Sequence, residues 1–400
     1  MKRTLLLLFS IIFCAMSAFA EVKIAPYYSI QFDQGIAIPT KGEWMYSADL
    51  TNDIGVILEP TKNHQFVTFY ELKYSGPGLK TEEGEKFTDR SMDHILVLQH
   101  NFDWKENYVL KSAIDHITEY TRTGTNEVWG TGLYDYLRYG FNVTLERKFN
   151  KDLSVNFNVQ YHLLDYPNYT DILAEFQAGG EAIESSTGKQ NQIIYQLGAS
   201  TKYKKLFGAV DFSLMDYTKQ RVVVDTVQDD QTYYSGNKQR DDLITIDAGY
   251  ELRLWERISF VPAINYKYKT SNQNYQHFDS ASSTVPVTYI SDYYDYTQLN
   301  ISFPIQLTLS KKWSFFCNPS IDVKTYLNRP PRDANNVFLT GNQHNELYVL
   351  GTGLTKQQND VTKMTLFYTY QTQSSNMKYE RYFPYNYAGH YFGISFNYTY

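Results

Sequence analysis

The stretch HYFGISFNYTY, residues 390–400, alternates between two kinds of side chain. Successive side chains of an extended strand point to opposite faces. One face of this stretch presents His390, Phe392, Ile394, Phe396, Tyr398 and Tyr400. The other face presents Tyr391, Gly393, Ser395, Asn397 and Thr399. Such a strand suits an apolar medium on one side and water on the other.

The same alternation recurs along the whole chain. It predicts about sixteen strands of roughly ten or more residues, the length that crosses a bilayer at a tilt of about 45°. The predicted strands are 22–33, 44–58, 65–75, 94–104, 108–121, 137–149, 153–163, 192–203, 206–217, 243–254, 258–270, 297–309, 313–327, 347–355, 361–371 and 390–400. Three of them contain a proline (Pro262, Pro304 or Pro319), which removes one ladder hydrogen bond and indicates a bulge or a strand end there.

The connectors between these strands alternate between short and long. The short connectors suit tight hairpins: 59–64, 105–107, 150–152, 204–205, 255–257, 310–312 and 356–360. The long connectors are 34–43, 76–93, 122–136, 164–191, 218–242, 271–296, 328–346 and 372–389. Short periplasmic turns and long outer loops are the asymmetry expected of a transmembrane barrel, and they would place both termini in the periplasm.

The chain therefore resembles the Gram-negative outer-membrane β-barrel proteins, in a porin-like form but with no specific family assignable. In that group the closing strand ends in an aromatic residue, most often Phe, where this chain has Tyr400. The resemblance implies recognition by the barrel assembly machinery during insertion. The predicted fold class is all-β, a transmembrane antiparallel up-and-down β-barrel of about sixteen strands. Residues 21–400 would form this single domain, with long extracellular loops.

The first twenty residues read as a cleaved signal peptide. Lys2 and Arg3 precede the apolar run 5–14, and small residues end in Ala18-Phe19-Ala20. Removal of 1–20 would leave 35 basic and 43 acidic residues, a net charge of −8 that argues against nucleic-acid binding. Only Cys317 would remain of the two cysteines, so neither an intramolecular disulfide nor a cysteine-rich zinc site is expected.

The composition fits export to the outer membrane. The mean hydropathy of −0.46 is that of a soluble protein, yet the chain carries 37 Tyr and 24 Phe. Because every second residue of a transmembrane barrel strand faces the lumen, low hydropathy combined with many aromatic residues is what this architecture predicts.

Charged residues on the polar faces of the strands are the predicted pore lining, because sixteen or so strands leave an aqueous channel. The ten acids are Asp49, Asp53, Glu71, Asp115, Glu119, Glu146, Asp211, Asp247, Glu251 and Asp322. The nine bases are Lys73, Lys111, Arg138, Lys202, Arg253, Lys267, Lys269, Lys324 and Lys363. This near balance predicts weak ion selectivity. The alternative role for each residue is a salt bridge or a solvated position in the wall.

A wide channel usually has a constriction. The third long connector, 122–136, is too short for the inward-folded third loop of the general porins, so the fourth, 164–191, is the candidate. Thr170-Asp171 could cap a short helix there. The candidate constriction residues are Asp171, Glu175, Glu181 and Glu184. The alternative is a surface loop.

These features predict a porin-like channel in the outer membrane for passive diffusion of small hydrophilic solutes. The alternatives are a polysaccharide or polymer-export barrel and a non-conducting surface barrel whose tyrosine-rich loops bind glycans. No Ser-His-Asp arrangement is recognisable, so we expect no enzymatic activity, no cofactor and no metal. The expected partners are outer-membrane lipids and the solutes. Analogy with porins adds a homotrimer, which nothing in the sequence itself indicates.

Overall fold

The computed structural model describes residues 22–76, 90–122, 128–169, 189–226, 228, 233–277, 288–380 and 384–400. The predicted signal peptide, 1–20, lies outside the described residues. Within them, no helix is long and apolar enough to cross a bilayer.

The described residues form β-strands that make one large sheet and one small hairpin. The strands are β1 (Lys23–Pro39), β2 (Met45–Thr61), β3 (His64–Gly76), β4 (Arg90–Lys105), β5 (Tyr108–Arg122), β6 (Tyr136–Lys148), β7 (Leu153–Asp165), β8 (Gln192–Tyr203), β9 (Leu206–Val223), β10 (Tyr234–Tyr250), β11 (Leu252–Trp255), β12 (Ile258–Phe260), β13 (Ala263–Ser271), β14 (Tyr275–His277), β15 (Thr288–Ile290), β16 (Tyr296–Ser302), β17 (Ile305–Thr308), β18 (Trp313–Tyr326), β19 (His344–Gln357), β20 (Thr362–Ser375) and β21 (Tyr387–Thr399).

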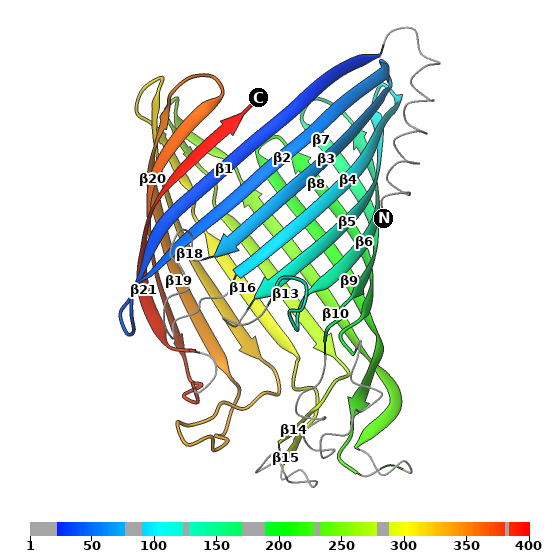
Figure 1. Cartoon of the computed structure of the whole chain (residues 1–400), viewed down its shortest axis with the longest axis vertical. Helices are drawn as coiled ribbons and strands as arrows, with labels where there is room; N and C mark the ends of the chain where they lie inside the picture. Colours follow the sequence, from blue (N-terminus) through cyan, green and yellow to red (C-terminus); the bar gives the residue numbers. More distant parts are fainter. Residues whose placement is uncertain are drawn as a thin grey trace.

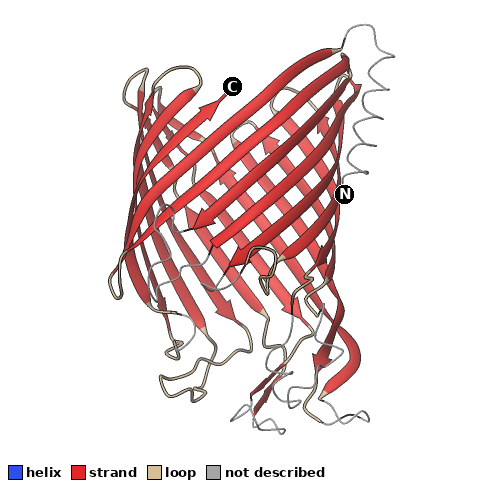
Figure 2. Ribbon diagram, in the orientation of Figure 1, coloured by secondary structure: helices blue, strands red, loops and turns tan. Residues whose placement is uncertain are grey.

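The large sheet is a closed barrel of sixteen antiparallel spans (Figures 1 and 2). Its nineteen strands reduce to sixteen because β10 with β11, β12 with β13, and β16 with β17 each make one span. The last span closes the ring on the first, in the register from Ser29 opposite Thr399 to Pro39 opposite Gly389. The predicted all-β, up-and-down barrel is confirmed, and its closing strand is the stretch that ends the chain.

The outer face of the barrel is apolar and the inner face is polar. Phe157, Leu197 and Leu366, which lie on three different spans, each leave more than half of their side-chain surface uncovered. Trp104, Trp255 and Trp313 are exposed beside short turns, the position of the aromatic girdle of a membrane barrel. Closure gives every span two hydrogen-bonded neighbours, which is the condition for a sheet to survive in hydrocarbon.

The three prolines lie on one oblique seam across neighbouring spans. The carbonyls of Pro262, Pro304 and Pro319 accept hydrogen bonds from the amides of Tyr250, Val261 and Phe303 respectively, at 2.9 to 3.0 Å. In an antiparallel sheet the nitrogen and the carbonyl of one residue point to the same neighbouring strand. Each proline nitrogen, which has no hydrogen, therefore faces the preceding span, at the point where that span is interrupted. Pro262 and Pro304 separate β12 from β13 and β16 from β17, whereas Pro319 lies inside β18. The expected bulges and strand ends thus combine into a single feature.

The end of the barrel opposite the C-terminus carries long loops, and several predicted strands there are too short. β9 continues to Val223 and β10 begins at Tyr234, inside the predicted connector 218–242. The hairpin of β14 and β15 occupies part of the connector 271–296 and projects beyond the barrel (Figure 1). The strand pairing continues past the predicted ends, but residues 218–221 and 235–242 carry no apolar side chain, so alternation in the sequence does not predict this extension.

A packed cap, which we call the crown, is built from the described parts of 272–295, 327–343 and 376–386. Tyr293, Gln343 and Met377, one from each connection, are 4%, 0% and 2% exposed. The Arg332 amide lies 3.3 Å from Met377 Sδ, and its guanidinium donates to the Tyr275 hydroxyl at 2.7 Å. Much of the fully buried material of the described chain therefore lies in the crown and at the adjoining strand ends, rather than in the barrel wall.

Candidate functional site

The predicted pore-lining residues all lie in strands except Glu251, which separates β10 from β11. They occupy the alternate positions to the exposed apolar side chains, so they share the inner face. Four ion pairs join eight of them across or along the wall: Glu71–Lys73 at 2.7 Å, Asp115–Arg138 at 2.8 Å, Lys111–Glu146 at 3.0 Å and Lys202–Glu251 at 3.0 Å. Part of the lining charge is thus neutralised within the wall.

Carboxylates crowd on the inner face of β2 to β5. Asp53 lies opposite Glu71, and Asp93 lies opposite both Lys73 and Glu119 in the strand register. We call Asp53, Glu71, Asp93 and Glu119 the acidic arc. One oxygen each of Asp53 and Asp93 is buried without a hydrogen-bond partner among the described residues. Lys73 is the only base in these register pairs, so the arc keeps a net negative charge.

Lysines and arginines gather on the inner face of β13 and β18 and in the adjoining crown. Lys267 and Lys324 flank Gln298 from the two neighbouring strands. Arg329 and Arg332 follow in the connection after β18. We call Lys267, Lys324, Arg329 and Arg332 the cationic arc. Each of its members is half-buried, and no carboxylate of the described chain lies within ion-pair distance of any of them.

Aromatic rings, rather than carboxylates, pack against the cations of this arc. Lys324 Nζ lies 3.8 Å from the ring centre of Tyr296 and 4.9 Å from that of Tyr326. The Arg329 guanidinium lies 4.8 Å and 4.7 Å from the rings of Tyr293 and Tyr326. Ring faces attract a cation through their quadrupole but do not cancel its charge.

The tyrosines of the crown remain neutral hydroxyls. Burial raises the pKa of Tyr294 to about 12, with a further rise from its neighbour Tyr293 that the nearby Arg329 opposes. Burial likewise raises the pKa of Tyr293, despite the two arginines beside it. Neither ring supplies a negative charge at neutral pH, so both arginines keep their positive charge uncompensated by these groups.

The acids near the cationic arc have partners of their own. Asp322 accepts hydrogen bonds from both Gln298 Nε2, at 2.8 and 2.9 Å, and Asn300 Nδ2, at 3.3 Å. Asn265 Nδ2 donates to Asp247 at 2.6 Å. Amides therefore satisfy these carboxylates, and Lys267 and Lys324 have no ion pair with any residue that the structure describes.

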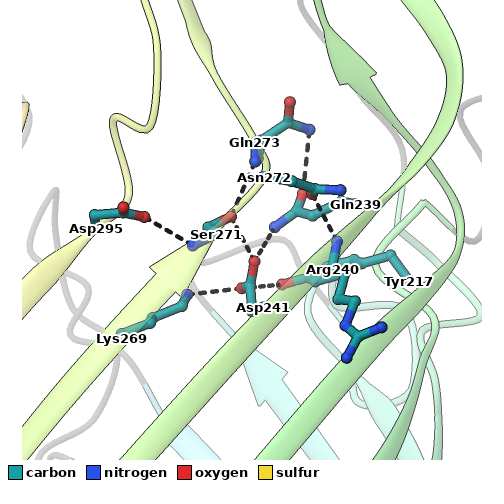
Figure 3. Close-up of polar contacts among 9 residues, drawn as sticks. All are labelled: Tyr217, Gln239, Arg240, Asp241, Lys269, Ser271, Asn272, Gln273 and Asp295. Carbon is teal, nitrogen blue, oxygen red and sulfur yellow. Dashed lines mark hydrogen bonds and ion pairs between the residues drawn. The ribbon is translucent and has the colours of Figure 1, made fainter.

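Asp241 is the centre of a polar network where β10 and β13 approach the crown (Figure 3). It is 1% exposed, and Lys269 Nζ donates to its Oδ2 at 2.7 Å. Its Oδ1 accepts from Ser271 Oγ at 2.6 Å and from Gln239 Nε2 at 3.1 Å. A buried charge is tolerated when paired and hydrogen-bonded in this way. The network joins the barrel wall to the crown, because the Ser271 amide also donates to Asp295 at 2.7 Å.

Several site residues were missed by the sequence reasoning. Asp93, Asp241 and Arg329 all fall in predicted connectors, although Asp93 and Asp241 lie in strands and Arg329 in the crown. Alternation could not have found Asp241, because residues 235–242 carry no apolar side chain on either face. The candidate constriction residues Asp171, Glu175, Glu181 and Glu184 lie outside the described residues.

No metal-binding group is found in the described parts of the chain, in the sense of three or more neighbouring His, Cys, Asp or Glu side chains. Of the histidines, His100, His116 and His390 share the outer face with exposed apolar residues, and His390 hydrogen-bonds Tyr368 at 2.9 Å. His162 is on the inner face, 8% exposed, and bonded to Gln160. None of these contacts forms a nucleophile, base and acid arrangement.

Comparison with solved structures finds barrels of the same length and low sequence identity. OccAB1 of Acinetobacter baumannii matches with a TM-score of 0.50 and 11% identity, over 94% of this chain and 96% of that one. OmpT of Vibrio cholerae, an outer membrane protein folded in vitro, matches with 0.45 and 9%, over 95% and 98%. A bacterial polysaccharide outer membrane secretin matches with 0.46 and 11%, over 94% and 97%.

These similarities bear on the fold. The OccAB1 match supports the barrel assignment, and the resemblance to Gram-negative outer-membrane β-barrels is confirmed at that level. No family model and no curated protein matches the sequence.

Proposed function

We propose that this protein is a porin-like outer-membrane channel through which small hydrophilic solutes diffuse. The signal peptide would direct it to the periplasm, the short-turn end with both termini would face the periplasm, and the crown would face the exterior. Outer-membrane lipids would surround the apolar outer face. A homotrimer is compatible with this arrangement. We assign it no catalytic role.

One observation carries the proposal: a closed ring of sixteen spans has an apolar outer face and a charged inner face. About eight strands fill their own interior with side chains, whereas sixteen leave an aqueous lumen. The inner-wall acids and bases, including Glu71, Lys111 and Arg138, are the groups that water-filled channels carry on their walls. A lumen that was dry would leave these charges without solvation.

Planar-bilayer conductance tests the channel directly. Purified, refolded protein should insert as discrete conductance steps, and liposomes containing it should swell in sugars with a cut-off that depends on solute size. Absence of steps, together with absence of swelling in even the smallest sugar, would contradict an open channel. Trp fluorescence and heat-dependent gel mobility of the same sample would show that the barrel had folded.

A second candidate, a closed barrel that binds ligands through its loops, is favoured by the packed crown. Tyr293, Gln343 and Met377 are almost completely buried there. A barrel of this kind would be folded and crown-intact yet would conduct no ions. Removal of the crown connection 328–343 would then open conductance in a variant of a silent protein, whereas a channel conducts before the deletion.

A further inference from the structure

We propose that the cationic arc is a binding site for small organic anions that carry a carboxylate or phosphate group. Lys267, Lys324 and Arg329 would bind the anionic oxygens, and the rings of Tyr293, Tyr296 and Tyr326 would line the site. The site adds a ligand class to the proposed channel, and it depends on that proposal only for the route by which a solute arrives.

The strand register fixes the position of the two lysines. Lys267 on β13 and Lys324 on β18 both lie beside Gln298 of β16. Neighbouring strands are about 4.8 Å apart, so residues two strands apart are separated by roughly 10 Å at the backbone. Two long side chains on one face at this spacing can reach a single carboxylate or phosphate between them. Gln298 cannot repel that anion with a charge, and its amide nitrogen is already directed to Asp322.

Arg329 adds a third cation above the lysines. It lies three residues after the end of β18, and its guanidinium packs on the ring of Tyr326, which also contacts Lys324. Nη2 is 3.3 Å from the Tyr385 hydroxyl, but Nε is buried without a hydrogen-bond partner in the described chain. A guanidinium packed against two rings is oriented without being neutralised, so Arg329 keeps its positive charge beside the lysines.

The positive charge of Lys324 lies mainly among other positive charges. Among the described residues, Lys267, Lys269 and Arg329 act on Lys324 as like charges, and Asp322 acts on it as an opposite charge. Lys269 is already paired with Asp241, and Asp322 with amides. Like charges this close repel one another, so a bound anion would relieve the repulsion that the wall by itself leaves in place.

The tyrosines indicate what the rest of the ligand is like. Tyr296 and Tyr326 meet edge to face, with ring centres 6.0 Å apart, and Tyr293 stacks on Tyr275 at 4.4 Å. Ring faces and edges of this kind contact the apolar side of a sugar or a planar ring. Acidic sugars and sugar phosphates combine both requirements, an anionic group and a ring with an apolar face.

Isothermal titration calorimetry in detergent tests the site without requiring transport. Galacturonate is compared with galactose, and glucose 6-phosphate with glucose, so that each anion has a neutral partner of the same ring. Saturable binding of at least one anion is expected, with the neutral sugar about tenfold weaker or more. The two anions separate a carboxylate ligand from a phosphate ligand.

Variants locate the binding. Lys324→Gln and Arg329→Gln should each lower the affinity for the anion by about tenfold, because each removes one charge-assisted hydrogen bond. Arg329→Lys, which keeps the charge, should weaken it less than Arg329→Gln. Lys111→Gln is the matched control, because Lys111 is an inner-wall lysine already paired with Glu146 at 3.0 Å, and it should leave the affinity within about twofold.

Three results would overturn the proposal: no saturable binding of either anion, equal binding of an anion and its neutral partner, or equal loss in Lys111→Gln and Lys324→Gln. Heat-dependent gel mobility of every variant confirms a folded barrel. A protein that binds the anion but forms no conductance steps would retain this site and refute only the open channel. A protein that conducts but binds neither anion would refute this site and leave the open channel uncontradicted.

Discussion

The acidic arc and the cationic arc both hold charge on the inner face of the barrel, but their charges have different neighbours. In the acidic arc, Asp53, Glu71, Asp93 and Glu119 lie against one another with Lys73 as the one base in register. In the cationic arc, carboxylates are held by amides and cations by tyrosine rings. Counting spans around the closed ring puts the fourth span, β4, opposite the twelfth, β16 and β17. The two arcs therefore face each other across the lumen.

This difference teaches that an overall balance of charge conceals a separation of charge. The ten acids and nine bases predicted to line the lumen nearly cancel, and this led to the expectation of weak selectivity. A solute, however, responds to the local field of the wall it passes. Whether the net selectivity is weak stays a prediction, while the two arcs make the field across the lumen uneven.

The largest expected effect is on the free energy of unfolding. It should differ between Asp241, beside the cationic arc, and Asp93 of the acidic arc. Asp241→Ala would leave the half-buried Lys269 unpaired, which should lower the free energy of unfolding by about 3 kcal/mol. Asp93→Ala removes a like-charge neighbour of Glu119 and should change it by less than about 1 kcal/mol. Urea unfolding in lipid vesicles, followed by Trp fluorescence, measures both.

The double variant Asp241→Asn with Lys269→Gln is the control for that comparison. It replaces the ion pair by neutral groups of similar shape and should recover much of the loss. Equal destabilisation by Asp241→Ala and Asp93→Ala would show that the two arcs are held together in the same way.

The next effect concerns ion selectivity and has opposite signs for the two arcs. Glu71→Gln with Asp93→Asn should shift the reversal potential in a salt gradient toward that of an anion-selective channel. Lys267→Gln with Lys324→Gln should shift it the other way. Removal of one charge should change the free energy of an ion beside it by about 1 kcal/mol in water. The occupancy of that position by the ion then changes roughly fivefold. Low salt is needed, because screening shortens the range of these charges. Shifts in the same direction would contradict the separation of charge.

A smaller effect isolates the role of the tyrosine rings. Tyr296→Leu removes the ring that lies 3.8 Å from Lys324 Nζ, and the lost cation–π contact should cost about 0.5 to 2 kcal/mol of unfolding free energy. A double-mutant cycle with Lys324→Met reports the coupling energy itself. Tyr268→Leu, on the outer face of the preceding span, is the matched control and should show no coupling to Lys324.

The smallest effect is a response of the crown to acid. Hydrogen bonds from Asn386 and Tyr385 to Glu380 outweigh the effect of burial and hold the pKa of this carboxyl below its usual value of 4.5. A lowered acid pKa stabilises the folded state above the unfolded pKa, and the contribution is lost as pH falls through the folded value. Amide exchange at Tyr385 and Asn386 should therefore speed up below about pH 4.5 relative to the intrinsic rate.

Glu380→Gln tests the origin of that acid response. The glutamine should already show the faster exchange at neutral pH and should lose the additional change in acid. Acid sensitivity that is unchanged in Glu380→Gln would assign it to another group of the crown.

The spans could be predicted from the sequence because the membrane imposes a simple pattern. The strands 390–400, 153–163 and 44–58 each put apolar residues at alternate positions. Closure of the sheet then gives the backbone groups of every strand a hydrogen-bonded neighbour. The strand ends were harder. β9 and β10 continue through 218–223 and 234–242, but residues 218–221 and 235–242 carry no apolar side chain on either face, so period-two alternation does not predict strand there.

Which charges are neutralised could not be predicted, because partners in a barrel come from distant parts of the chain. Gln298 separates Lys267 from Lys324 only after β13, β16 and β18 have paired in register. Likewise Asp241 meets Lys269 and Ser271 only when β10 and β13 are neighbours. Alternation assigns a residue to the inner face but is silent about the residue beside it.

The sequence by itself determined an all-β chain with sixteen amphipathic spans and an inner face of mixed charge, because period-two alternation is a local property of the backbone. Only the tertiary structure decided that the acids gather on β2 to β5, that the cations of β13, β18 and the crown lie among tyrosines, and that Asp241 is buried. Strand register and loop packing set those neighbours, and both are properties of the closed barrel rather than of any one segment.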